Sequence, residues 1–207
     1  MVSTDLILCQ DRFLLRQRWA PMVNRYEFFL PGDDGQPGEP ICFVEQKRVT
    51  FKEDIRFYAD ETKSREILRI KARQRFDPAA RYDVTEADGT RIGQIQKAFG
   101  ASLLRSTYLL YDETGEEVAR AQEQSLWVAL LRRLWDVFPY VGAVSDWVPI
   151  PYHFEFKRGD ELLGIHYRQP FKFRDTYTID LSFDAERTLD RRLVLATSVG
   201  MDALQAR

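Results

Sequence analysis

The C-terminal segment restricts the fold of this chain most strongly, because it is apolar around most of a helical circumference. From Leu193 to Leu204 the polar residues are small, with the exception of Asp202. A helix on a protein surface keeps a charged face, so a helix without one is surrounded by protein or lipid. About twelve helical residues span only about 18 Å, which is too short to cross a bilayer. We therefore expect residues 188–207 to form a helix enclosed by the rest of the chain.

Three parts of the chain, residues 81–97, 107–122 and 152–166, share the pattern of a β-hairpin. In each, an alternating apolar and polar run leads through a glycine-containing turn into a second such run, which is typical of antiparallel strands with one buried face. Glycine supplies the positive φ that such turns require. Residues 31–40, rich in Pro and Gly, are expected to form an exposed loop. Further strands are expected at residues 41–46, 55–58, 67–76 and 174–180.

Successive hairpins around an enclosed helix predict a mainly β fold. Barrels with more than about eight strands have room inside, and a helix can fill it. We expect a closed antiparallel barrel that forms one domain over residues 1–207, with residues 1–40 contributing one or more strands and the exposed loop. At 207 residues the chain has a suitable length for one large all-β domain.

The charge and cysteine content exclude several classes of protein. The chain carries 30 basic and 32 acidic residues, for a net charge of −2, so a general nucleic-acid binder is not expected. The two cysteines, Cys9 and Cys42, lack metal-type spacing and are too few for a disulfide framework. The N-terminus has no basic region followed by a long apolar run, as a secretory signal would. We expect reduced thiols and a cytoplasmic location.

No pattern of catalytic or cofactor-binding residues stands out. His153 and His166 are the only histidines, and neither has a partner at zinc spacing. Neither a nucleophile elbow nor a glycine-rich nucleotide-binding loop occurs in the sequence. Glu45, Glu53 and Asp54 are interpreted as counter-charges on the surface. We therefore predict no enzyme activity, no cofactor and no metal.

Residues 124–138 have apolar residues at spacings of three and four, which predicts an amphipathic helix between the two halves of the barrel. Its exposed stripe would be costly in water, since burying each Trp or Leu side chain contributes roughly 2 kcal/mol. The stripe therefore covers the barrel, forms a homodimer interface or enters lipid headgroups. In the lipid alternative, the membrane-contacting residues would be Trp127, Leu131 and Trp135.

Three segments resemble bacterial LURP-one-related proteins: the hairpin around Asp88-Gly89, the stretch from Ser102 to Tyr108, and the helix that starts near Leu189. The resemblance extends roughly from Ile41 to the end of the chain. These proteins belong to a wider group that contains phospholipid scramblases and Tubby C-terminal domains. The resemblance implies twelve strands around a hydrophobic C-terminal helix. Since Tubby domains bind phosphoinositides through basic surface residues, it also implies a binding role.

Basic side chains alternate with less polar ones in the predicted strand 67–76, and a strand places such side chains on one face. The row consists of Arg69, Lys71, Arg73 and Arg75. A shorter row consists of Arg168, Lys172 and Arg174. Because arginine forks suit phosphate oxygens, we predict a non-enzymatic module that binds anionic phospholipid headgroups at the inner membrane surface. A solvated face balanced by acids is the simpler interpretation of the first row.

Two alternative functions are kept open. The first is a structural or protein-interaction domain that forms a homodimer through residues 124–138. The second is a small-ligand carrier or an enzyme with a cleft at the mouth of the barrel, since barrels hold ligands near their ends.

Overall fold

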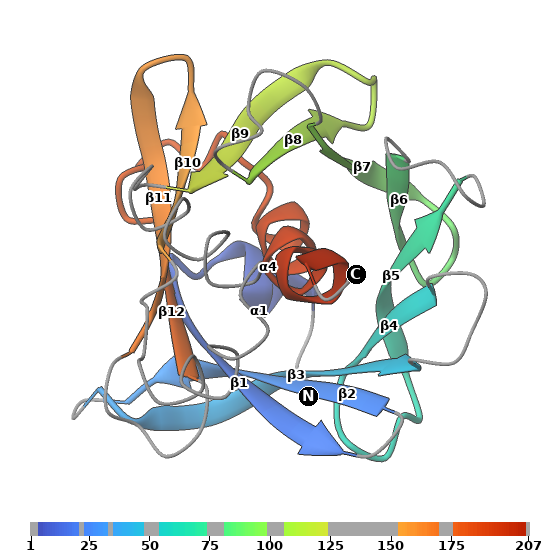
Figure 1. Ribbon diagram of the computed structural model, residues 1–207. Helices are drawn as coiled ribbons and strands as arrows, with labels where there is room; N and C mark the ends of the chain where they lie inside the picture. Colours follow the sequence, from blue (N-terminus) through green and yellow to red (C-terminus); the bar gives the residue numbers. More distant parts are fainter. Residues whose placement is uncertain are drawn as a thin grey trace, which may run out of the picture.

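The computed structural model describes residues 4–20, 23–32, 35–47, 54–73, 81–98, 106–123, 153–169 and 176–205. Within these ranges, twelve strands close into an antiparallel barrel around the C-terminal helix α4 (Arg191–Gln205), as Figure 1 shows. The mainly β fold and the enclosed helix predicted from the sequence are confirmed. The predicted helix at residues 124–138 lies outside the described residues.

The strands follow one another around the barrel in chain order, and β1 pairs with both β2 and β12 to close it. They are β1 (Arg12–Ala20), β2 (Val23–Pro31), β3 (Pro37–Lys47), β4 (Asp54–Tyr58), β5 (Glu66–Ala72), β6 (Arg81–Glu86), β7 (Arg91–Lys97), β8 (Thr107–Asp112), β9 (Glu117–Glu123), β10 (His153–Arg158), β11 (Glu161–Arg168) and β12 (Thr176–Asp180).

Alternation along each strand divides the barrel wall into an apolar inner face and a polar outer face. In β4, Ile55 and Phe57 are buried, whereas Asp54, Arg56 and Tyr58 are only partly buried. Residues directly opposite each other on neighbouring strands share a face, so the pattern continues around the barrel. The inner face packs on α4, and the outer face carries the charged groups available for binding.

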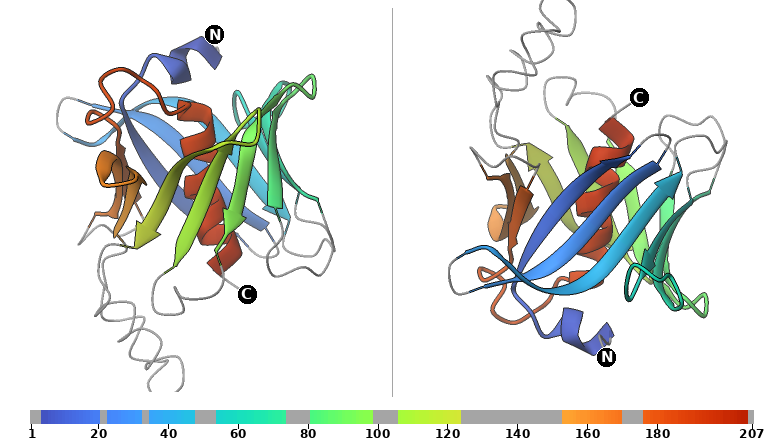
Figure 2. Two further views of the ribbon diagram at one scale, coloured as in Figure 1. Left: turned by 90° about the horizontal axis from the view of Figure 1, so that it is seen from above. Right: turned by 90° about the horizontal axis from the view of Figure 1, so that it is seen from below.

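Helix α4 runs along the axis of the barrel from one end toward the other (Figure 2). Every residue of the helix from Leu193 to Met201 is buried. The two polar residues of this stretch satisfy their hydroxyls within the helix, since Thr197 donates to the Leu193 carbonyl at 2.7 Å and Ser198 donates to the Val194 carbonyl at 2.9 Å. The helix begins at Arg191 rather than at residue 188, with Asp190 capping the Arg192 N–H at 2.8 Å.

Two features of the N-terminal region differ from the predictions. A short helix, α1 (Thr4–Leu8), precedes the first strand and packs the buried Ile7 against the core. The exposed loop predicted at residues 31–40 was too long, because β2 continues through Pro31 and β3 already begins at Pro37. The pairing of β2 and β3 is irregular at Phe29, and strand ends and bulges tolerate prolines because they need fewer ladder hydrogen bonds.

A buried ion-pair cluster holds the start of α4 at one end of the barrel. The Arg191 side chain is 1% exposed and donates to the Asp184 carboxylate at 2.5 Å and to the Asp11 carboxylate at 2.8 Å. It also donates to the Leu189 carbonyl at 2.9 Å. Asp11 accepts a further bond from Arg187 at 3.1 Å. These contacts join the residue before β1, the loop after β12 and the helix, and we call them the collar.

The collar predicts a loss of stability in acid. Burial would raise the pKa of Asp184, but hydrogen bonds from the Leu189 N–H, Arg191 and Thr188 outweigh it and lower the pKa. Hydrogen bonds from Arg191 and Arg187 lower the pKa of Asp11. A carboxyl group with a lowered folded-state pKa stabilises the protein above its unfolded pKa of about 3.9, and this stabilisation is lost as the pH falls through the folded-state value.

We therefore expect the urea midpoint to change little between about pH 7 and pH 5 and to fall below about pH 4. Denaturation followed by circular dichroism measures this. The Asp11→Asn variant, which has one such carboxyl group fewer, should lose less stability between about pH 4 and pH 2. An equal loss in the variant and the wild type would contradict a role of Asp11.

Candidate functional site

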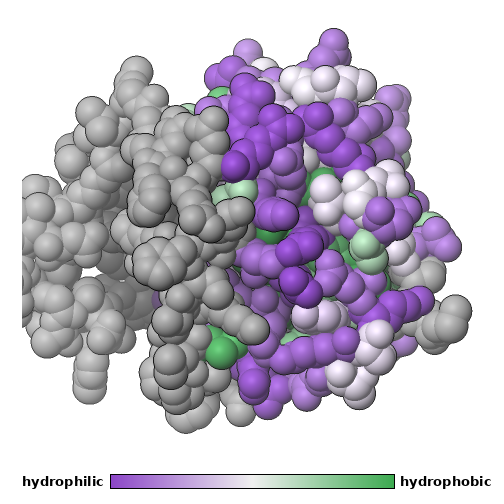
Figure 3. Space-filling model, turned by 90° about the vertical axis from the view of Figure 1, so that its right-hand side faces the viewer, coloured by the Kyte–Doolittle hydropathy of each residue, from purple (hydrophilic) through white to green (hydrophobic). Residues whose placement is uncertain are grey.

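The basic row predicted from the sequence lies on the outer face of β5. Arg69 and Lys71 alternate with the buried residues Leu68 and Ile70, and Arg73 directly follows the strand. Figure 3 views this side of the barrel, whose described surface is mostly hydrophilic. The strand is shorter than the predicted 67–76, and the fourth residue of the row, Arg75, lies outside the described residues.

Acids on the two neighbouring strands already bind two of these cations. Arg69 donates from Nε and Nη2 to the two carboxylate oxygens of Asp54, at 2.7 and 2.5 Å. Arg73 Nε donates to both carboxylate oxygens of Asp83, at 2.9 and 2.8 Å. Lys71 is exposed and lies opposite Asp54 on β4 and opposite Asp83 on β6. The interpretation of Asp54 as a counter-charge is confirmed.

The outer face of β4 to β6 nevertheless carries more positive than negative charges. Burial would raise the pKa of Asp54, but its hydrogen bonds from Arg69 and Arg56 lower it, so the carboxylate stays ionised and bound. The same bond to Asp54 raises the pKa of Arg69. On the described outer face of β4 to β6, with Arg73, five cations surround three acids. The cations are Arg56, Arg69, Lys71, Arg73 and Arg81, and the acids are Asp54, Glu66 and Asp83.

The other predicted site residues do not join this row in the described structure. Arg168 lies at the end of β11, which is on the opposite side of the closed barrel from β5. Five further candidates, from the second basic row and from segment 124–138, lie outside the described residues. They are Lys172, Arg174, Trp127, Leu131 and Trp135.

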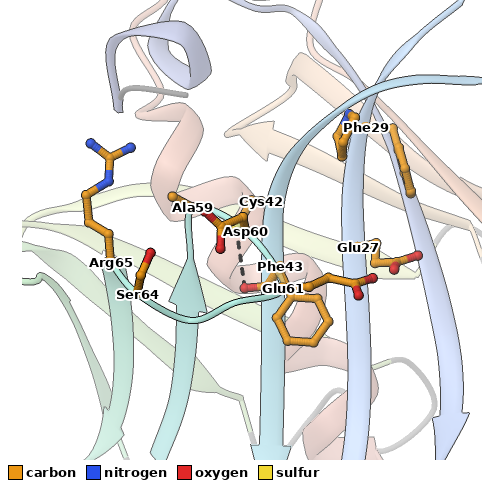
Figure 4. Close-up of a pocket in the computed structure, with 10 residues that line it drawn as sticks. Glu27, Phe29, Cys42, Phe43, Ala59, Asp60, Glu61, Ser64 and Arg65 are labelled. Atoms are coloured by element: carbon orange, nitrogen blue, oxygen red, sulfur yellow. Dashed lines mark hydrogen bonds between the residues drawn. The ribbon is translucent and has the colours of Figure 1, made fainter. Parts of the chain in front are cut away.

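A second surface feature is a groove on the outside of the barrel, which the sequence did not indicate. The turn between β4 and β5, residues 59–65, folds outward over β3 and β2. Arg18 of β1 donates to Glu61 of the turn at 2.8 Å, and Lys63 forms an ion pair with Glu45 of β3. Beneath the turn lies a groove of about 680 Å³ (Figure 4). Its lining consists of Glu27, Phe29, Pro40, Cys42, Phe43, Ala59, Asp60, Glu61, Ser64 and Arg65.

Glu27 is the most buried charged group of this groove, with 8% of the residue exposed. Arg18 donates to it at 2.6 Å and also binds Glu61, so two carboxyl groups share one guanidinium. Burial and the contact with Glu61 raise the pKa of Glu27, and Arg18 opposes this only in part. The thiol of Cys42 is buried, and burial raises its pKa, so it is not a reactive nucleophile.

The described part of the barrel offers little support for metal chemistry. His166 is 4% exposed, and its ring stacks on Tyr177 with centroids 5.2 Å apart, so it forms part of the packed wall. Among the described residues, no three His, Cys, Asp or Glu side chains are grouped so that they could hold a metal ion. In the same part of the chain, no helix has both the length and the apolar character needed to cross a membrane.

Comparison with known protein families explains this architecture. The family model described as LURP-one-related matches residues 41–202, which is most of the chain. The protein belongs to the LURP-one-related family. This family is part of the Tubby-like superfamily, in agreement with the twelve strands and the central helix. Searches of curated proteins and of solved structures gave no match.

Membership of the LURP-one-related family supports a Tubby-like binding module at the level of the whole domain. It does not by itself identify a binding surface, because one fold carries unrelated sites in different proteins. The match begins at Ile41, within β3, so Glu27, Phe29 and Pro40 of the groove lining lie before the matched region and the rest of the lining lies inside it. The basic face of β5 lies entirely inside it.

Proposed function

We propose that this LURP-one-related protein is a non-enzymatic module that binds anionic phospholipid headgroups at the cytoplasmic surface of the inner membrane. The observation that carries the proposal is the projection of Arg69, Lys71 and Arg73 from one outer face. Cations exceed acids on this face although the whole chain has a net charge of −2. Phosphate oxygens are the natural partners of such a face.

The two paired arginines and the lysine would contribute differently to the binding of a phosphate group. Arg69 and Arg73 each donate two bonds to a carboxylate, so an approaching phosphate competes with Asp54 and Asp83 for the same guanidinium groups. Lys71 is exposed, and no ion pair of its ammonium occurs among the described residues. We therefore expect Lys71 to be the most important single cation and the affinity to be low and strongly dependent on salt.

The remaining candidates belong to the same proposal. Arg75, Lys172 and Arg174 would add cations at the membrane surface, and Trp127, Leu131 and Trp135 would insert between headgroups. Peripheral attachment usually needs more than one signal, and a weak basic face combined with an apolar wedge would supply two.

The Lys71→Glu variant is expected to bind anionic vesicles more weakly than the wild type. A basic residue near an anionic surface contributes about 1 kcal/mol, so charge reversal should cost about 2 kcal/mol, or roughly thirtyfold in partitioning at low salt. Co-sedimentation with vesicles of phosphatidylcholine alone, and with phosphatidylserine or a phosphoinositide added, measures this. Raising the salt concentration should reduce the difference between the vesicles.

The matched control is Arg12→Glu, which reverses an exposed cation that also faces an aspartate, Asp180, on the neighbouring strand. Because β1 lies away from the basic face, this variant should retain most of the vesicle binding. Equal retention of wild-type protein by neutral and anionic vesicles, or an equal effect of both reversals, would overturn the proposed face.

A further inference from the structure

The two ends of the barrel are formed by different parts of the chain. Neighbouring strands are antiparallel, so the odd-numbered strands run toward one end and the even-numbered strands run toward the other. The turns within the hairpins, helix α1 and the loop from β12 to α4 lie at the end where α4 begins, which we call the turn end. The odd-numbered strands finish at the opposite end, where α4 also finishes, and we call it the C-terminal end (Figure 2).

Acidic residues predominate at the turn end. Nine acids and three basic residues occur in five of its described connections, which are residues 59–65, 87–90, 113–116, 159–160 and 181–190. The acids are Asp60, Glu61, Asp88, Glu113, Glu116, Asp160, Asp184, Glu186 and Asp190, and the basic residues are Lys63, Arg65 and Arg187. Asp184 is buried in the collar, whereas the other eight acids are exposed or partly exposed. This end of the barrel therefore repels an anionic surface.

Basic residues predominate at the C-terminal end. Among the described side chains that begin or finish a strand there, or directly adjoin it in the chain, four are basic and two are acidic. The basic residues are Arg73, Arg81, Lys97 and Arg168, and the acids are Asp54 and Glu123. Glu123 is buried and Asp54 is already ion-paired, so neither offers a free negative charge at the surface. The groups that bind Arg81 within the described ranges are uncharged, since Gln96 accepts a hydrogen bond from it at 3.1 Å and the centre of the Tyr111 ring lies 4.6 Å from its guanidinium.

The sign of the charge changes along β5 itself. The strand begins with Glu66 at the turn end, and it finishes at the C-terminal end with the exposed Lys71, followed by Arg73. An anionic surface that lay along the whole flank of β5 would meet Glu66 and the exposed Asp60 and Glu61 of the preceding turn. An anionic surface at the C-terminal end would avoid these acids. The 15 residues of α4 separate the two ends by about 22 Å, and the Debye length at physiological salt is about 8 Å, so the acidic turns would then be largely screened from it.

We propose that the barrel meets an anionic membrane end-on, with its C-terminal end at the headgroups and its acidic turns directed into water. This inference rests on the proposed function and adds the orientation in which the module binds. Basic contacts then come from several sides of the barrel, so Arg168 of β11 acts together with Lys71 and Arg73, although β11 and β5 lie on opposite sides. The opposite charges of the two ends also steer the molecule into this orientation as it approaches.

Charge reversal at Arg168 distinguishes end-on binding from binding through the flank of β5. End-on binding places Arg168 at the headgroups, so Arg168→Glu should reduce partitioning onto vesicles that contain phosphatidylserine by about tenfold or more at about 0.1 M salt. Binding through the flank would leave partitioning of this variant unchanged. The control is Arg12→Glu, which reverses an exposed cation at the turn end and should retain most of the binding.

Fluorescent labels at the two ends measure the orientation directly. The exposed thiol of Cys9 follows α1 at the turn end, whereas the thiol of Cys42 is buried, so a thiol-reactive dye labels the wild type at Cys9. The double variant Cys9→Ser, Ala98→Cys carries the dye at the C-terminal end instead, directly after β7. With phosphatidylserine vesicles whose lipid headgroups carry a nitroxide quencher, the dye at position 98 should be quenched and the dye at position 9 should not.

The possible results separate the orientation from the proposed function. Equal quenching of the two labels, stronger quenching of the dye at Cys9, or undiminished vesicle binding by Arg168→Glu would overturn end-on binding and leave lipid binding intact. Equal retention of the wild type by neutral and anionic vesicles would overturn the proposed function and the orientation with it. The labelled proteins keep all the basic residues, so the quenching decides the orientation even where Arg168→Glu folds poorly.

Discussion

Replacing Gly93 with alanine is expected to destabilise the barrel by about 3 kcal/mol or more, or to prevent folding. A Cβ atom at this position would overlap the backbone carbonyl oxygen of Tyr111 on the neighbouring strand β8, and it would lie 3.3 Å from Leu193 of α4. The carbonyl cannot move without disturbing the ladder between β7 and β8. The absence of a side chain at Gly93 thus allows the backbones of β7 and β8 to approach each other closely and leaves room for Leu193 of α4.

Gly200→Ala is the matched control, because Gly200 is also buried at the contact between α4 and β7. Its added Cβ would meet only the Cδ1 atom of Ile95, at an ordinary 3.9 Å. Alanine is favoured over glycine inside a helix by about 1 kcal/mol, so this variant should be unchanged or more stable. Urea denaturation of both variants measures the difference. A loss below about 1 kcal/mol for Gly93→Ala would show that the Tyr111 carbonyl of β8 does not approach Gly93 as closely as described.

Several parts of the fold could be predicted from the sequence because each depends on one segment alone. The enclosed helix followed from the lack of a charged face between Leu193 and Leu204, which is a property of the local sequence alone. The hairpins followed from glycines in turns, and Gly89, Gly115 and Gly159 indeed have positive φ values of 91°, 94° and 57°. Features that depend on one segment were therefore within reach of sequence analysis.

Features that depend on two distant segments were not predicted. The basic row on β5 was recognised, but its pairing with Asp54 and Asp83 depends on the register of β5 with β4 and with β6, and the register of β4–β5 shifts at Phe57/Tyr58. The groove depends on the contact between Arg18 and Glu61, which lie 43 residues apart. Helix α1 was missed because five residues are too few for a clear period. Cross-strand contacts of this kind leave no local pattern in a single sequence.

Replacing Asp184 with asparagine is expected to destabilise the protein by about 3–5 kcal/mol. The carboxylate is 3% exposed and binds the equally buried guanidinium of Arg191. It also accepts the Thr188 and Leu189 N–H groups at 3.0 and 2.9 Å, and the Thr188 hydroxyl at 2.8 Å. Asparagine preserves the size of the side chain but removes its charge, which leaves Arg191 with Asp11 as its remaining carboxylate partner.

Asp112→Asn is a suitable control because the hydrogen-bonding chemistry is similar and the burial is not. Asp112 accepts the N–H groups of Thr114, Gly115 and Glu116 and the Thr114 hydroxyl, in the turn between β8 and β9. This turn is largely solvated, so water replaces the lost charge–dipole contacts, and the loss of stability should be much smaller. Urea denaturation at about pH 7, well above both aspartate pKa values, measures both variants.

The double variant Asp184→Asn, Arg191→Gln separates the two possible causes of the loss. If the damage comes from a buried cation deprived of its partner, removing that cation should restore part of the stability, and the two single losses should not add. Additive losses would mean that Arg191 reaches solvent in the single variant and that the collar does not seal this end of the barrel. In that case the start of α4 would be held by its apolar contacts alone, and the acid sensitivity expected for the wild type should also be absent.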